Sequence, residues 1–262
     1  MAGRSPLRTL HFHLINIQAL IIRDLMARFG RNNMGFVWTI LEPMILTTGV
    51  LGIWSIIHGD MMHGVSVLAM ALTGYMPLTL WRHMTNPMTR ILQTHSELLY
   101  HRRLSHFDIV FARAFLEFTS TTAALMTVYF VLLVAGLVQP VHDWTLLLMA
   151  WLFVAAFYGG MGFMIGAMTQ YSENAEKFIT PSQYFLLPAS GTFFMVDWMP
   201  GVYQRVLLWY PPIHAVEMFR AGFMGADVIT HYDVTYIAAW SFVMLVLGIF
   251  AIYAVRDRIE FS

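Results

Sequence analysis

The sequence contains no cysteine and a single lysine, and charged residues make up 11% of its 262 residues, against roughly 25% in an ordinary soluble domain. Without cysteine there is no disulfide framework, no thiolate ligand for zinc or an iron–sulfur cluster, and no Cys nucleophile. The lysine, Lys177, follows Glu176, so the chain lacks a phosphate-binding loop of the G-x-x-x-x-G-K-[ST] type. Any ATP that drives this protein is therefore expected on another chain.

Apolar residues, in contrast, are in large excess. Hydrophobic residues make up 58% of the chain, including 20 Met, 20 Phe and 8 Trp. This apolar content is too large and too evenly spread for one core wrapped in water-facing helices, which excludes a soluble enzyme and predicts a membrane protein. The 15 basic and 15 acidic residues cancel, so no bulk positive field draws the chain to nucleic acid.

Six stretches are predicted to be transmembrane helices, because a helix needs about 20 apolar residues to cross roughly 30 Å of hydrocarbon. They are 34–57, 65–92, 109–138, 144–168, 178–196 and 234–255. The second is mixed in character after Trp81, and the fifth is broken by Pro181 and Pro188. With no internal repeat and no low-complexity linker, the sequence predicts a single all-α, polytopic membrane domain over 1–262.

The basic residues are distributed unevenly between the loops. Thirteen of the 15 lie in the two termini, in the loops on one side of the membrane, or in the adjoining helix ends. The long segment 197–233 on the other side holds the remaining two, Arg205 and Arg220. Because Lys and Arg concentrate in cytoplasmic loops, this distribution predicts six spans with both termini in the cytoplasm.

Two further segments fit neither a span nor a simple loop. Residues 11–31 place apolar side chains on one helical stripe and Arg23, Arg28 and Arg31 elsewhere, which predicts an amphipathic helix in the membrane interface. Two interpretations of this helix are open. It is a membrane anchor only, or its arginines also attract an anionic lipid headgroup. The prolines in residues 197–233 predict short helices between the last two spans. If these helices re-enter the membrane, their backbone must be buried in protein or line a passage.

Aromatic residues are dense in the last third of the chain, and two interpretations compete for them. They include Tyr184, Phe185, Phe193, Phe194, Trp198, Trp209 and Tyr210. They form either an interfacial aromatic belt or stacking faces that line a path for sugars. Arg82, deep in the second span, favours the path, because a guanidinium within the membrane usually faces a partner or a wet cavity. In the alternative interpretation, the Arg82 side chain extends towards the lipid headgroups and lines no path.

Other candidate sites have structural interpretations. Arg113 and Glu117, four residues apart, predict an ion pair near the cytoplasmic boundary of the third span. Gly162 and Gly166 form a G-x-x-x-G pattern that predicts close helix packing. The loop HGDMMHG (58–64) offers two His and one Asp, but a short polar loop explains the same residues. We predict no metal site and no cofactor in this chain.

Three stretches, taken in order, resemble ABC-2 type permeases that export polysaccharide, and among them the capsule-export permeases of the KpsM, BexB and CtrC kind. They are RFGRNNMGFVWTILEP (28–43), ELLYHRRLSHFDIVFARAFLE (97–117), and the run from ASGTFFMVDWMP (189–200) through WYPPIHAVEMFRAGF (209–223). The second is similar to the family's cytoplasmic coupling segment and its D-x-x-x-A-R-x-x-x-E entry to the third span. The three stretches match in both order and spacing, so the resemblance extends over nearly the whole chain.

The resemblance implies a homodimer in the bacterial inner membrane, with each six-span subunit bound to one copy of a cytoplasmic ATPase that holds ATP and Mg. It implies export of a lipid-linked polysaccharide, with periplasmic co-polymerase-type and outer-membrane export proteins continuing the route. It places short helices of 197–223 at the periplasmic gate. It also implies that the segment 95–108 docks on the ATPase, with Glu97, Leu98, Leu99, Arg102, Arg103, Phe107 and Asp108 as the contact residues.

Other functions compete with capsule export. An ABC-2 exporter of another glycan, such as O-antigen or teichoic acid, or of a drug or small lipid, would keep the coupling segment. An intramembrane enzyme would need a convergent set of catalytic residues, and the sequence shows none. A passive channel would need no ATPase. Co-purification with an ATPase separates the two exporters from the enzyme and the channel.

Overall fold

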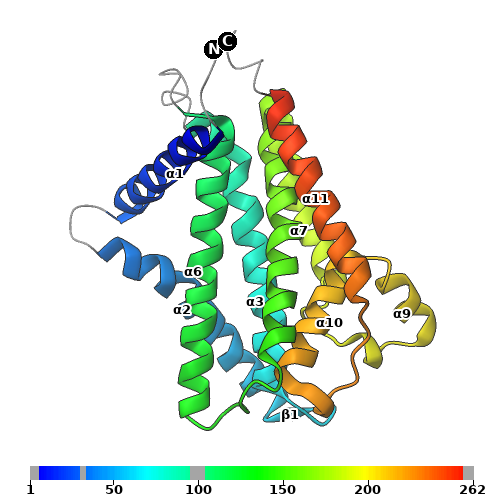
Figure 1. The fold of residues 1–262 in the computed structure, drawn as a ribbon. Helices are drawn as coiled ribbons and strands as arrows, with labels where there is room; N and C mark the ends of the chain where they lie inside the picture. Colours follow the sequence, from blue (N-terminus) through cyan, green and yellow to red (C-terminus); the bar gives the residue numbers. More distant parts are fainter. Residues whose placement is uncertain (1–5, 30–33, 95–103, 256–262) are drawn as a thin grey trace.

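The fold was obtained as a computed structural model, which describes residues 6–29, 34–94 and 104–255. Nearly all described elements are helices, which confirms the prediction of an all-α polytopic protein. Helix α1 (Pro6–Phe29) and the C-terminal end of α11 (Val234–Val255) lie at one end of the molecule, and a short hairpin lies at the other (Figure 1). The long helices α6 (His106–Val134), α7 (Trp144–Tyr171) and α11 run between these ends.

The first two helices are α1 (Pro6–Phe29) and α2 (Met34–His58). Helix α1 begins at a proline, whose fixed φ suits the first helical position, so the helix starts five residues before the predicted segment 11–31. It packs on α6 and α2 and crosses the end of the bundle obliquely (Figure 1). The N-terminal part of α2 lies apart from the bundle in this view, while the helix also packs on α3 and α6. Only 17% of the apolar span in α2 is buried within the chain.

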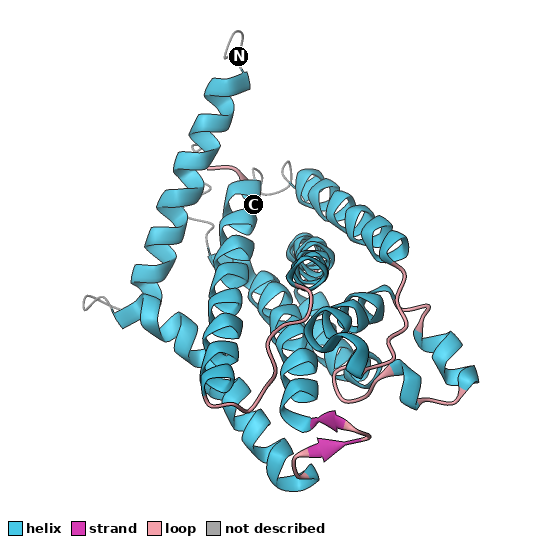
Figure 2. Ribbon diagram, turned by 60° about the horizontal axis from the view of Figure 1, so that its bottom comes forward, coloured by secondary structure: helices cyan, strands magenta, loops and turns pink. Residues whose placement is uncertain are grey.

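A hairpin of β1 (Met61–Met62) and β2 (Val65–Ser66) connects α2 to α3, and Figure 2 shows it in magenta beside the helices at its end of the molecule. Its turn residues His63 and Gly64 have φ angles of 51° and 81°, and two positive φ angles in a row are typical of the tight turns that join paired strands. Helix α3 (Val67–Thr85) follows, with the Ser66 side chain as its N-cap. A 3₁₀ turn, η2 (Asn86–Arg90), and α4 (Ile91–Thr94) complete this region.

The centre of the bundle is built from α6 (His106–Val134) and α7 (Trp144–Tyr171). Side-chain caps fix where they begin: Ser105 and Asp108 form a capping box at the start of α6, and Asp143 accepts hydrogen bonds from Thr145 N and Leu146 N at the start of α7. Helix α7 packs against α3, α10 and α11. Its buried Trp151 lies against Phe219 of α10, with ring centroids 5.6 Å apart.

The helix expected over 178–196 differs from the observed one. Helix α8 runs from Glu173 to Leu186 and is followed by a single 3₁₀ turn, η3 (Leu187–Ala189), so residues 190–195 are not helical. Pro188 lacks the N–H that a continuing helix needs, and Gly191 has a φ of 74°, which glycine adopts at no steric cost. The prediction of a helix through 196 is therefore wrong in its second half.

Short helices fill the segment between α8 and the last span, as the prolines predict. They are η4 (Val196–Trp198), α9 (Gly201–Leu207), α10 (Pro211–Met224) and η5 (Gly225–Asp227), and α11 (Val234–Val255) follows. The residues of α10 from Pro212 to Arg220 are buried, and α10 packs against α7, α11 and α3. This helix therefore belongs to the interior of the bundle (Figure 1).

Among the described residues, four helices are long and apolar enough to cross a membrane. These are α6, α7, α11 and the part of α2 from Leu41 to His58. Helix α3 has 19 residues but carries Arg82 and His83 in its last turn, and α8 has only 14 residues. The count of six spans, which needs α3 and α8, stays a prediction.

Candidate functional site

Arg82 and Tyr184 lie together, at the contact between α3 and α8. The guanidinium carbon of Arg82 is 5.4 Å from the centroid of the Tyr184 ring, a distance at which a cation is attracted to the face of an aromatic ring. Beside them, Gln183 Nε2 donates to Thr85 Oγ1 at 3.0 Å. Tyr184 is 60% exposed and Phe185 is 89% exposed. Three of the residues predicted to line a path therefore lie in one place: the Arg82 cation and the accessible rings of Tyr184 and Phe185.

The other predicted aromatics contact different elements. Phe193 stacks on Trp54 of α2, with centroids 5.6 Å apart, and Trp198 stacks on His63 of the hairpin at 4.5 Å. Trp209 is 82% exposed, whereas Phe194 is partly buried and its carbonyl accepts a hydrogen bond from α10. Within one chain, the predicted aromatic set is therefore divided among several places.

Tyr210, in the turn before α10, faces the interior. Its hydroxyl lies 3.4 Å from that of Tyr158 on α7, and the Tyr158 ring stacks on Trp81 of α3 at 5.3 Å. Burial raises the pKa of Tyr210 above its ordinary value, because a buried phenolate loses its hydration. Tyr210 is thus a neutral hydroxyl that joins α10 to α7.

A buried charged pair on α10 organises the non-helical segment after α8. Arg220 is 0% and Glu217 1% exposed, and Arg220 Nη1 lies 3.2 Å from Glu217 Oε1. The guanidinium also donates to the backbone oxygens of residues in the non-helical segment: to Phe194 at 2.7 Å, Gly191 at 2.7 Å and Thr192 at 3.3 Å. These carbonyls have no helical partners, and buried carbonyls require a donor. We call this group, residues 191–196 with Glu217 and Arg220, the α10 clamp.

Glu217 completes the clamp through both of its carboxylate oxygens. Val196 N donates to Oε1 at 3.3 Å, and His231 N donates to Oε2 at 3.1 Å. The His231 ring lies 3.1 Å from Asp197 Oδ1. One carboxylate therefore ties the segment before α9 to the segment before α11, so the short helices of 197–233 are held at both ends.

Glycine at position 74 is explained by the same clamp. A Cβ atom built on Gly74 of α3 would lie 2.1 Å from the Thr192 carbonyl oxygen and 3.1 Å from Arg220 Nη2. No side chain fits there without moving backbone. Glu217 and Arg220 are not among the predicted site residues, although the E-x-x-R spacing within the apolar run IHAVEMFRAGF (213–223) places the two charges on one helix face.

Asp108, predicted to contact an ATPase, instead faces α1. Its side chain is 0% exposed; Oδ1 lies 2.6 Å from His13 Nδ1, and Oδ2 accepts from Asn16 Nδ2 at 3.2 Å and from Ser105 N at 3.2 Å. The assignment of Asp108 to a partner surface is therefore wrong in this structure, because its carboxylate is satisfied within the chain. Phe107 also packs internally, against Phe111 and Phe163.

The remaining predicted residues fall into two groups. Arg113 Nη2 lies 2.8 Å from Glu117 Oε1, and His83 Nδ1 lies 3.5 Å from the other carboxylate oxygen, so the predicted pair also reaches α3. Arg23 lies 3.0 Å from Asp24. The second group lies outside the described residues: Glu97, Leu98, Leu99, Arg102, Arg103 and Arg31, together with the side chain of Arg28.

A family model for the ABC-2 type transporter matches residues 15–224, a range that holds most of α1, all of α10 and all residues of the α10 clamp. The chain belongs to the ABC-2 type transporter family.

Similar proteins of known name agree with this assignment. The ABC-2 chain is 34% identical over 233 residues to the capsule polysaccharide export inner-membrane protein CtrC of Neisseria meningitidis serogroup B, with 89% of this chain and 88% of CtrC covered. It is 32% identical over 233 residues to the capsule polysaccharide export inner-membrane protein BexB of Haemophilus influenzae, with the same coverage. It is 25% identical over 247 residues to the polysialic acid transport protein KpsM of Escherichia coli, covering 93% and 94%.

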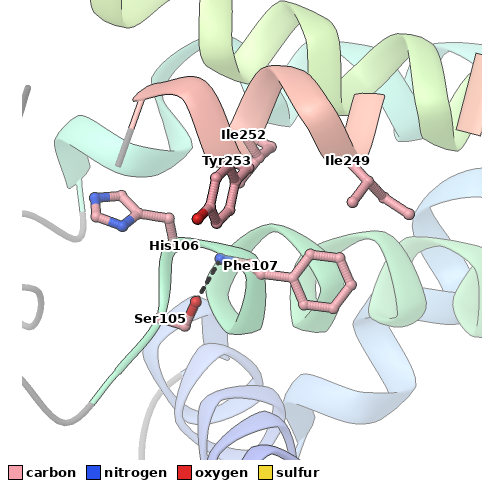
Figure 3. A pocket seen from close by; sticks show the side chains of 6 residues that line it. All are labelled: Ser105, His106, Phe107, Ile249, Ile252 and Tyr253. Atoms are coloured by element: carbon pink, nitrogen blue, oxygen red, sulfur yellow. Dashed lines mark hydrogen bonds between the residues drawn. The ribbon is translucent and has the colours of Figure 1, made fainter. Parts of the chain in front are cut away.

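The ABC-2 chain also has a small cavity where α6 begins and α11 ends. Its volume is about 290 Å³, and it is lined by Ser105, His106, Phe107, Ile249, Ile252 and Tyr253. Figure 3 shows the lining as two helix ends facing each other, with the Ser105 hydroxyl turned back to cap Phe107 N. In the part of the chain that the structure describes, no group of three or more His, Asp or Glu side chains is arranged to hold a metal ion.

Proposed function

We propose that this chain is the permease subunit of an ABC transporter that exports a lipid-linked capsular polysaccharide across the bacterial inner membrane. The observation that carries this proposal is similarity over 89% of the chain to two proteins named for capsule polysaccharide export. The lack of a phosphate-binding loop fits a subunit whose ATP and Mg are bound by a separate cytoplasmic ATPase. This chain would itself hold no cofactor.

The assembly we propose is a homodimer with two ATPase copies, continued by periplasmic co-polymerase-type and outer-membrane export proteins. The low burial of the span in α2 leaves a long helix face that is available to a second copy. Both termini would be cytoplasmic and the membrane would be crossed six times, by α2, α3 with α4, α6, α7, α8 and α11. The concentration of 13 of 15 basic residues on one side supports this orientation.

Within this assembly, residues 95–104 of the predicted docking segment 95–108 would meet the ATPase, because residues 105–108 form the N-cap and first turn of α6. The segment is cytoplasmic in the proposed topology, and its leucines are unusual for a solvated loop. Arg23, Arg28 and Arg31 would lie in the headgroup region of the cytoplasmic leaflet, where each basic residue near an anionic surface contributes about 1 kcal/mol. Another glycan, a drug or a small lipid remains the alternative cargo.

The proposed function predicts that this chain co-purifies with an ABC ATPase and that lipid-linked capsular polysaccharide stimulates ATP hydrolysis by the complex in liposomes. Leu99→Asp is expected to release the ATPase or to abolish the stimulation, because a charge would replace an apolar anchor. Stimulation by a drug or a free lipid, with no response to the glycan, would assign the alternative cargo. A purified chain that binds no ATPase would contradict the proposal altogether.

Arg82 is proposed to line the translocation path. Arg82→Ala is expected to lower export about fivefold, because it removes both the charge and its attraction to Tyr184, while abundance and ATPase binding stay at the wild-type level. Arg90→Ala is a matched control, since Arg90 is an exposed arginine nearby that pairs with Glu176 at 2.7 Å. Export would be measured as surface polysaccharide, and normal export by Arg82→Ala would remove this residue from the path.

A further inference from the structure

The carboxylate of Asp108 connects three parts of the chain. It lies in the first turn of α6 and is fully buried. It accepts hydrogen bonds from the side chains of His13 and Asn16 of α1 and from the backbone N–H of Ser105. We call His13, Asn16 and Asp108 the α1 clasp. The His13 contact, at 2.6 Å, is short, as charge-assisted hydrogen bonds are.

The clasp is a strong attachment because a buried carboxylate needs donors. An ionised group without partners is costly inside a protein, and among the described residues two of the three donors at Asp108 come from α1. Separating α1 from α6 would leave, of these donors, the Ser105 N–H. Helix α1 packs on α6 and α2, and its Leu20 is buried in the main hydrophobic core, with Ile17 and Ile21 packed against that core, so apolar burial also holds α1 to the bundle.

The α1 clasp lies next in the chain to the segment that is proposed to meet the ATPase, so it can transmit movement. Ser105, the N-cap of α6, directly follows the segment 95–104 that is proposed to meet the ATPase. Helix α6 continues for 29 residues through the bundle. A displacement applied at its base is passed to α1 if the two helices cannot separate, since packed helices move as rigid elements with discrete arrangements.

We propose that the α1 clasp makes the interface helix move as one body with the base of α6, so that the ATPase stroke reaches α1 as well as the spans. His13, Asn16 and Asp108 are positioning residues in this mechanism. The inference rests on the proposed function for the source of the stroke, but the attachment itself is a property of this chain alone.

The simpler interpretation is that Asp108 only caps α6. Variants can distinguish this capping role from the proposed attachment of α1. His13→Ala together with Asn16→Ala removes the clasp and leaves the capping box of Ser105 and Asp108 in place. Gln18→Ala is the matched control on α1, because Gln18 lies on the exposed face of the same helix. A capping role alone predicts that the double variant behaves like this control.

The absence of cysteine allows a direct distance measurement. Spin labels would be placed on cysteines introduced at Leu14 of α1 and Phe115 of α6, which are 56% and 47% exposed. Pulsed electron paramagnetic resonance on the complex with its ATPase would compare the nucleotide-free and vanadate-trapped states. We expect one narrow distance distribution, the same in both states, for the wild-type background and for Gln18→Ala.

In the double variant we expect a broadened distribution, with the detached population raised about tenfold by loss of the charge-assisted contact. We also expect less polysaccharide exported per ATP hydrolysed, a ratio that a fall in protein abundance alone does not change. A narrow distribution and an unchanged ratio in the double variant would overturn the clasp and leave the proposed function standing. The labelled chain reports the distance without the ATPase as well, so failure to bind an ATPase would overturn the proposed function separately.

Discussion

Replacing Arg220 by methionine is expected to abolish export and to leave little folded protein in the membrane. The change removes the donor to three backbone carbonyls, those of residues 191, 192 and 194, and leaves Glu217 buried without its cation. Breaking a buried ion pair by removing one partner costs about 3–5 kcal/mol, a large part of a typical stability of about 5–15 kcal/mol. Size-exclusion profiles of a fluorescent fusion, recorded after heating, would measure the loss.

A double variant shows whether the charge pair or the backbone contacts matter. Replacing a buried ion pair by apolar residues of similar volume is often neutral, so Glu217→Leu with Arg220→Met would regain stability if the two charges served only each other. We expect no recovery, because the carbonyls of the clamp and the N–H groups of Val196 and His231 would remain unpaired. Arg205→Met, on the exposed face of α9, is the control and should behave as wild type.

The parts of the fold that the sequence predicts are those set by local chemistry. Apolar length locates α2, α6, α7 and α11 to within a few residues, because the hydrocarbon thickness determines how long a span must be. Prolines correctly mark the short helices of 197–233. The non-helical stretch after α8 is not predictable in this way, because its carbonyls are satisfied by Arg220, a partner about 26 residues further along the chain.

The candidate site shows the same limit. Periodicity says which residues share a helix face but not which helix they meet, so Arg82 and Tyr184 lie together while Phe193, Trp198 and Trp209 lie elsewhere. The resemblance implies a partner contact for Asp108, as the last residue of the segment 95–108. The spacing of Ser105 and Asp108 is a capping-box signal, and it would have indicated that this carboxylate turns back into the chain.

The close approach of α7 and α11 rests on Gly160, in the G-rich run of the fourth span, and on Gly248 of α11. A Cβ atom on Gly160 would lie 2.3 Å from the Met244 carbonyl oxygen, and one on Gly248 would lie 2.4 Å from the Gly160 oxygen. A Cβ atom on Gly162 would likewise overlap with Met84 O of α3. The predicted G-x-x-x-G packing is therefore seen at Gly162, and Gly160 serves the opposite neighbour. Small residues let helix backbones approach closely in a membrane.

Gly160→Ala is expected to force α7 and α11 apart, because the added methyl group meets backbone, which cannot rotate away as a side chain can. Overpacking costs about 1–3 kcal/mol, and in a chain of this size the upper value corresponds to a fall of about 10 °C in the apparent melting temperature. Gly159→Ala is the neighbouring control: its Cβ would meet nothing within 4 Å, and alanine favours a helix over glycine by about 1 kcal/mol. A thermal-shift measurement on both variants in the same detergent should therefore move them in opposite directions. Equal shifts for the two would mean that the helices are not held at the spacing that the clash at Met244 requires.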